Sequence, residues 1–130
     1  MREIKFRAWS EDTREMVQVA RLDIKEGTIH YENGIKSINR EQELGFWWKP
    51  YVLMQYTGLK DKNGVEIFEG DIVLDRWANA YTPVFQNGIY MAYNPKNLMQ
   101  NEPSTQFNII WRDGCEIIGN IYENSDLLEV

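Results

Sequence analysis

The sequence predicts a small, mainly antiparallel β domain, and three observations lead to this prediction. Asn-Gly and Asp-Gly dipeptides, which supply the positive φ angles of tight β-hairpin turns, occur four times along the 130 residues. The segments beside them alternate apolar and polar side chains with the period of two that is typical of half-buried strands. Hydrophobic residues make up 43% of the chain and charged residues 26%, close to the averages of folded soluble domains. The dipeptides are Asn33-Gly34, Asn63-Gly64, Asn87-Gly88 and Asp113-Gly114.

The first forty residues are predicted to form a β-meander. Residues 4–9 have the sequence IKFRAW, and its alternation indicates a half-buried first strand. Residues 16–24 and 28–38 continue the strand pattern. The second of these segments is expected to fold as a hairpin about Asn33-Gly34.

The middle of the chain is predicted to be the structural centre of the domain. Residues 52–56, 65–68 and 71–74 have the β-branched and aromatic content of strands. Glycine, asparagine and aspartate between them supply the backbone angles and local hydrogen bonds of turns. The residues predicted to shape these turns are Gly58, Asn63, Gly64, Gly70 and Asp71.

The last third is predicted to contain two more hairpins. Residues 75–105 have aromatic side chains separated by Asn, Gln and Pro, which predicts one hairpin about Asn87-Gly88 followed by a loop. Residues 107–111 and 116–122 flank Asp113-Gly114. We expect these two segments to pair as strands.

Two short helical turns are also expected. Asn39 is a suitable N-cap for a turn over residues 39–44, and Gly45 can end it. Residues 46–51 would then form a packed connection, because Pro50 interrupts their aromatic run. Near the end of the chain, Ser125 can cap a turn over residues 126–129.

Charge and cysteine content indicate the compartment and the class of partner. The net charge is −6, which opposes general attraction to nucleic acid and anionic membranes. Residues 1–40 contain 8 basic and 7 acidic residues, so the excess of acid lies in the remainder. The single cysteine, Cys115, allows no intrachain disulfide, and neither a secretory signal nor a long apolar span is evident. We expect a cytoplasmic protein without membrane contact.

Three segments together resemble a known family. They are IKFRAW at residues 4–9, LMQYTGLKDKNG at 53–64 running into EIFEGDIV at 66–73, and IGNIYEN at 118–124. In this order they are similar to the YopX family of small phage and prophage proteins. The variable part lies at about 75–105, and Ser125 stands where the family pattern often has proline.

The resemblance implies a mainly β fold whose C-terminal part looks like an SH3-like barrel, and an origin in a phage or prophage. It implies no established activity, so no catalytic residue can be carried over. We expect a single domain over residues 1–130, with an N-terminal β subregion at 1–51. The barrel-like subregion would span 52–130 and include the variable insertion.

The carboxylates of the central segment are the main candidate metal ligands. Asp61, Glu66, Glu69 and Asp71 lie close together in the sequence, and oxygen ligands suit hard cations. The calcium-loop pattern fails, because Gly64 follows Asp61 too early and no glutamate stands at the last position of the loop. Local hydrogen bonding within turns is the favoured interpretation.

Other catalytic chemistries have a weak basis in this sequence. His30 and Cys115 are the only histidine and cysteine, too few for structural zinc. They could form a nucleophile and base only if the fold brought them together. The glycines are scattered and form no phosphate-binding loop. No cofactor is therefore expected.

An aromatic segment is the candidate partner surface. Its residues are Trp77, Tyr81, Phe85, Tyr90 and Tyr93. Packing within the domain is the simplest interpretation of such rings, and an exposed binding patch is the alternative.

Three functional hypotheses remain. The first is a non-enzymatic accessory protein that binds a protein partner, or itself, through residues 77–93. The second is nucleic-acid binding by Arg2, Lys5 and Arg7 with nearby aromatic rings. The third is a metal-dependent enzyme that uses the carboxylates between Asp61 and Asp71.

Overall fold

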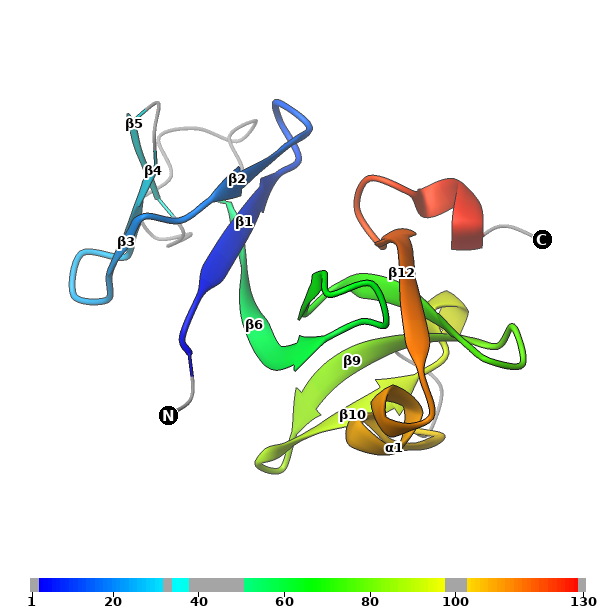
Figure 1. Ribbon diagram of the computed structural model, residues 1–130. Coiled ribbons are helices and arrows are strands. Elements are labelled where there is room, and N and C mark those ends of the chain that lie inside the picture. Colours follow the sequence, from blue (N-terminus) through cyan, green and yellow to red (C-terminus); the bar gives the residue numbers. More distant parts are fainter. Residues whose placement is uncertain (1–2, 32–33, 38–50, 98–102, 129–130) are drawn as a thin grey trace. The chain divides into compact units, whose positions relative to one another are not determined.

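The computed structural model describes residues 3–31, 34–37, 51–97 and 103–128, and the chain is mainly antiparallel β, as predicted (Figure 1). It divides into two compact units. The first unit is Ile4–Gln55, and the second is Tyr56–Val130 with Met1–Glu3. Strand β6 (Val52–Lys60) begins in the first unit and ends in the second.

The first unit is built on a β-hairpin and a small meander. Strand β1 (Phe6–Ser10) pairs with β2 (Glu15–Gln18) and, on its other side, with β6. Strands β3 (Arg21–Asp23), β4 (Thr28–Tyr31) and β5 (Gly34–Ser37) form a separate antiparallel sheet. Tyr31 pairs with Gly34, so a hairpin is present here, but Gly34, which was predicted in its turn, lies in strand β5. The two residues between Tyr31 and Gly34 lie outside the described part of the chain. The predicted helical turn at 39–44 lies outside it as well.

Strand β1 differs from its prediction in burial. Residues 7–10 are all buried, and the ring of Trp9 is almost completely covered. Burial therefore does not alternate from residue to residue along β1, although a half-buried strand was predicted. Ala8 packs with Ile29 and Tyr51 in a small apolar cluster, and the Tyr51 hydroxyl donates a hydrogen bond of 3.0 Å to Glu15.

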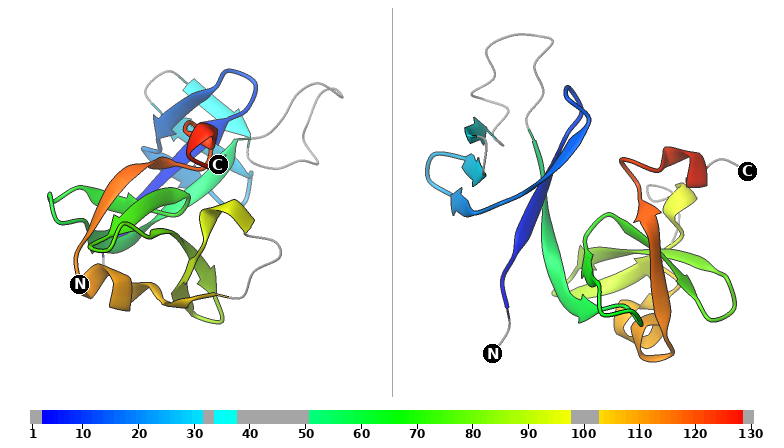
Figure 2. Two further views of the ribbon diagram at one scale, coloured as in Figure 1. Left: turned by 90° about the vertical axis from the view of Figure 1, so that its right-hand side faces the viewer. Right: turned by 45° about the horizontal axis from the view of Figure 1, so that its top comes forward.

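The second unit is organised around a five-stranded antiparallel sheet that curls into half a barrel (Figure 2). Its spatial order is β11-β10-β9-β8-β12, and the SH3-like identity of the barrel stays a prediction. The strands of this unit after β6 are β7 (Glu66–Phe68), β8 (Asp71–Asp75), β9 (Ala80–Gln86), β10 (Ile89–Tyr93), β11 (Thr105–Gln106) and β12 (Cys115–Asn120). Its helices are η2 (Pro95–Asn97), α1 (Phe107–Arg112) and η3 (Ser125–Leu128).

The β9–β10 hairpin confirms the prediction at Asn87-Gly88. Both residues have positive φ, 54° and 87°, and the flanking Gln86 pairs with Ile89, as a type I′ turn requires. Counting along the ladder from this pair places Pro83 opposite Ala92, at a position whose N–H is not needed to bond β10. Proline is therefore compatible with the strand.

The final predicted hairpin is wrong, because residues 107–112 form helix α1. Phe107 and Ile110 lie one turn apart and both are buried, which is the helical period rather than the strand period. Gly114 adopts φ 95°, and its N–H donates to the carbonyl of Trp111 at 3.0 Å. The dipeptide Asp113-Gly114 thus ends a helix, which is a common role of glycine with positive φ.

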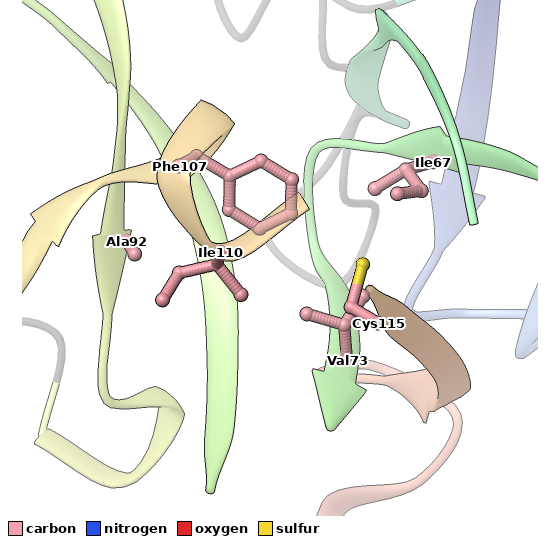
Figure 3. Packing of buried hydrophobic residues seen from close by; sticks show 6 residues of the cluster. All are labelled: Ile67, Val73, Ala92, Phe107, Ile110 and Cys115. Carbon is pink, nitrogen blue, oxygen red and sulfur yellow. The ribbon is translucent and has the colours of Figure 1, made fainter. Parts of the chain in front are cut away.

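The core of the second unit joins α1 to the sheet. Figure 3 shows Phe107 and Ile110 of α1 beside Val73 and Cys115, with Ile67 and Ala92 completing the cluster. Four of these six residues have no exposed surface, and the larger three of them are Ile67, Val73 and Phe107. Burying side chains of this size contributes roughly 1.5 to 3 kcal/mol each.

Strand β6 is longer than predicted. Gly58 lies inside it with φ 89°, where the sequence indicated a turn. The register with β7 shifts between the pairs Tyr56–Phe68 and Lys60–Glu66. Gly58 therefore forms an irregularity within the strand instead of ending it, which is one of the recognised uses of glycine in sheets.

Candidate functional site

The central carboxylate, Asp61, is a buried acceptor of backbone hydrogen bonds. Its Oδ1 accepts the N–H groups of Asn63 and Val65, each at 2.9 Å, and its Oδ2 accepts the N–H of Ile117 at 3.1 Å. Burial by itself raises the pKa of this carboxyl, but the three N–H donors and nearby Lys62 outweigh it, so the pKa lies below its usual range. Asp61 joins the turn after β6 to β12.

Asp71 has a similar structural role in the next turn. Its Oδ2 accepts the N–H of Phe68 at 2.8 Å, and the carbonyl of Gly70, a residue with φ 87°, accepts the N–H of Ile121 at 2.9 Å. Within the described residues, no group of three or more His, Cys, Asp or Glu side chains could hold a metal ion. The geometry of Asp61 and Asp71 supports the turn interpretation.

Two further predicted turn residues, Asn63 and Gly64, lie in the turn whose backbone N–H groups bond Asp61. Asn63 and Gly64 form the turn between β6 and β7, and the Gly64 N–H donates to the Asp61 carbonyl at 3.0 Å. Gly64 has φ 82°, whereas Asn63 is not among the residues with positive φ. This turn is therefore not of type I′, which needs two such residues.

A third turn, near the end of the chain, depends on Asn120 and Gly119, whose roles the sequence did not reveal. Asn120 Oδ1 accepts the N–H groups of Tyr122 and Glu123, at 3.0 and 2.7 Å. Asn124 Oδ1 accepts the N–H of Asn120 at 3.1 Å. A Cβ atom on Gly119 would lie 2.6 Å from Asn124 Oδ1, so a side chain at this position would force Asn124 to move.

The residues proposed for nucleic-acid binding do not form one exposed basic strand. Lys5 is exposed, whereas Arg7 is buried with 9% of its surface accessible. Arg2 lies outside the described residues. Because phosphate recognition needs accessible cations, this arrangement does not favour the second hypothesis.

The proposed nucleophile also has an unfavourable environment. Cys115 is buried in β12 of the second unit, and His30 lies in β4 of the first. Burial and the nearby Asp61 charge raise the pKa of the Cys115 thiol to about 11. The reactive thiolate is therefore scarce at neutral pH.

The predicted aromatic surface divides into exposed and packed rings. Trp77 and Phe85 are exposed, with 63% and 52% of their surfaces accessible. Tyr81 and Tyr90 are half-buried and pack against the core of the second unit. Tyr93 is buried, and its hydroxyl donates a hydrogen bond of 2.6 Å to Gln86. The five rings therefore do not form one continuous platform.

One candidate site lies at the turn end of the β9–β10 hairpin. Phe85 and Tyr90 face each other across the ladder, with ring centroids 5.0 Å apart in an edge-on contact. Ile89 beside them is 44% exposed. A hollow of about 260 Å³ opens here, lined by Thr57, Leu59, Ile89, Tyr90, Gln106 and Asn108. We call these residues, with Phe85, the hairpin-end site.

A second exposed feature is the Trp77 loop, residues 75–79 between β8 and β9. Asp75 Oδ1 accepts the N–H groups of Trp77 and Asn79, at 2.8 and 2.9 Å. Ala78 has φ 64°, an uncommon conformation for a residue other than glycine. The Arg76 guanidinium lies 5.1 Å from the centre of the Trp77 ring. These hydrogen bonds order the backbone of the loop on both sides of the exposed Trp77 side chain.

These features define a small antiparallel β protein with structural carboxylates, and its second unit contains the hairpin-end site and the Trp77 loop. A family model described as YopX protein matches residues 5–129. The chain belongs to the YopX family. Among the described residues, no helix is long and apolar enough to cross a membrane.

A solved structure supports the same assignment. The crystal structure of protein EF1440 from Enterococcus faecalis is 33% identical to this chain and has a TM-score of 0.65. The match covers 99% of this chain and 100% of that chain. A comparison with curated proteins gave no match.

Proposed function

We propose that this YopX protein is a non-enzymatic accessory protein of a phage or prophage that binds an extended segment of another protein at the hairpin-end site. It would act in the cytoplasm of a bacterial host. The observation that carries the proposal is the exposed pair Phe85 and Ile89 beside the hollow of about 260 Å³. Large apolar side chains gathered at a concave surface are typical of protein-binding sites.

The lining of the hollow indicates the chemistry of the segment. Its six lining residues include no charged side chain, so an uncharged, apolar side chain of the partner fits it without loss of ion hydration. Gln106 and Asn108 are exposed at its edge, and neither side chain forms a hydrogen bond with another described residue. Their amides can bond the peptide groups of an extended segment.

The non-enzymatic part of the proposal is supported by the positions of the reactive groups. The Asp61 and Asp71 carboxylates accept backbone N–H groups, and the pKa of the Cys115 thiol is raised to about 11. Groups held in this way serve the structure and are poorly suited to acid, base or nucleophilic chemistry.

Affinity capture from host lysate with matched variants tests the proposal. Ile89→Asp places a charge at the hollow, whereas Val65→Asp places one at another exposed apolar position of the second unit. We expect one protein to be captured by the wild type and by Val65→Asp, and its purified form to bind Ile89→Asp and Phe85→Ala at least about tenfold more weakly. Capture of no protein, or equal binding by all variants, would contradict the proposal.

A further inference from the structure

We propose that two copies of this chain form a symmetric dimer in which the Trp77 loop of each copy enters a hollow on the other. The hollow adjoins the loop and has a volume of about 320 Å³. Its lining residues are Lys62, Leu74, Asp75, Arg76, Ala78, Asp113, Gly114, Cys115 and Glu116. This inference is independent of partner binding at the hairpin-end site.

The Trp77 loop has the properties of a preformed contact. Trp77 is the most exposed aromatic residue in the described part of the chain, with 63% of its surface accessible. The backbone on both sides of it is fixed by Asp75, which accepts two N–H groups through Oδ1 and bonds Asn79 through its own N–H at 3.0 Å. Binding through a loop whose backbone is already ordered loses less conformational entropy than binding through a mobile loop.

Backbone strain points to the same loop. Ala78 has a φ of 64°. Residues other than glycine rarely adopt this left-handed conformation. A strained residue persists only where the surrounding structure holds it, and such residues gather at functional sites. Here the conformation follows directly after the exposed indole.

The hollow is available to a second molecule. Arg76 and Ala78 line it, but Trp77 between them does not, so the chain's own indole does not occupy it. Leu74 and Ala78 supply apolar surface, Asp113 and Glu116 supply carboxylates, and Lys62 and Arg76 supply cations. An indole with an adjacent cation fits such a lining.

Charge complementarity identifies the second copy as the occupant. Glu116 already pairs with Lys62 at 3.5 Å, and Asp75 is used by its own loop. Arg76 has no ion pair with another described residue, and the contact of Asp113 with Arg112 is long, at 3.9 Å. Arg76 of one copy can therefore pair with Asp113 of the other.

Symmetry makes each such contact occur twice. Cys115 pairs with Asp75 in the ladder of β8 and β12, so Asp113 before β12 and the Trp77 loop after β8 lie at the same end of the two strands. A surface that carries both a projecting group and a matching hollow is self-complementary under a two-fold axis. Tryptophan and arginine are also the residues most often dominant in interface energetics.

Sedimentation equilibrium of the purified full chain tests this dimer. We expect the wild type and Phe85→Ala to dimerise alike, and Trp77→Ala to raise the dimer dissociation constant at least about tenfold. A wild type that stays monomeric over the whole concentration range, or a Trp77→Ala variant that dimerises as the wild type does, would overturn the inference. Loss of dimerisation in Phe85→Ala would do so as well.

A charge exchange provides a second and independent test. Arg76→Glu and Asp113→Arg should each be monomeric, because like charges would meet twice across the axis. Mixed together, they should form a heterodimer in which both contacts have opposite charges. Both substituted side chains are exposed, and thermal unfolding checks that each variant is folded. Failure of two folded variants to associate on mixing would overturn the proposed pairing of Arg76 with Asp113.

Discussion

Asp61 accepts a hydrogen bond from the backbone N–H of Ile117 across a sequence separation of 56 residues, at 3.1 Å. The same carboxylate bonds the N–H groups of Asn63 and Val65 within its own turn. A side chain in the segment that is most typical of the family thus joins a local turn to the last strand. At Asp61 the family pattern therefore serves the fold.

Replacing Asp61 should destabilise the protein strongly. Asp61→Ala would leave three partly buried backbone donors without their acceptor, and we expect a loss of about 2 to 4 kcal/mol in the free energy of unfolding. Urea denaturation measures it. The exposed carboxylate of Asp126 provides the control, since Asp126→Asn should change stability by no more than about 0.5 kcal/mol. Equal effects of the two substitutions would contradict the role of Asp61.

The contribution of Asp61 should depend on pH in a defined direction. Its pKa in the folded protein is lowered, while the unfolded value is about 3.9. The stabilisation is therefore complete above the unfolded pKa and disappears as the pH falls through the folded pKa. The stability difference between wild type and Asp61→Asn, measured from pH 7 to pH 2, should shrink in the acid range. A difference that stays constant with pH would contradict this assignment.

Gly119 should tolerate no side chain. Gly119→Ala would place a Cβ atom 2.6 Å from Asn124 Oδ1 and 3.0 Å from Asn124 Cβ, and we expect a cost of about 2 kcal/mol from the forced displacement. Asn124→Gly removes both atoms, so the same substitution should cost less in that background. Gly88→Ala, where φ is 87° and no atom lies within 4 Å, should show a backbone cost of about 1 kcal/mol alone. A Gly119→Ala cost unchanged by Asn124→Gly would exclude the steric explanation.

Cys115 should be unreactive in the folded protein. The side chain is 2% exposed and its pKa is raised to about 11, so both access and thiolate fraction are low. At pH 8 we expect a disulfide reagent to react with it at least about a hundredfold more slowly than after unfolding in urea. Rapid reaction of the folded protein would show that β12 opens readily.

The sequence predicted those parts of the fold that local residues determine. Asn87-Gly88 forms the expected type I′ turn, and Ser125 begins a 3-10 turn. The prediction of a hairpin at Asp113-Gly114 was wrong, because glycine with positive φ ends helices as well as forming hairpins. Which role it takes depends on the burial of Phe107 and Ile110, a tertiary property.

The candidate sites were predictable only in part. Trp77 and Phe85 were identified as surface candidates and both are exposed, but Tyr93 is buried. Strand alternation cannot separate these residues, because neighbouring Ala92 and Tyr93 are both buried in β10 and Trp77 lies in a loop. Trp111, which the sequence placed in a strand, lies in α1, is 40% exposed and donates a hydrogen bond of 2.8 Å to the carbonyl of Lys60.

The position of strand β6 limits how one unit of the protein can be exchanged by recombination. Its first half pairs with β1 and its second half with β7, and the division between the units falls between Gln55 and Tyr56, within the strand. Exchange of one unit with that of a relative would therefore require a junction inside a paired strand. A junction that shifted the alternation by one residue would turn every later side chain to the wrong face. Recombination should consequently preserve the two units together.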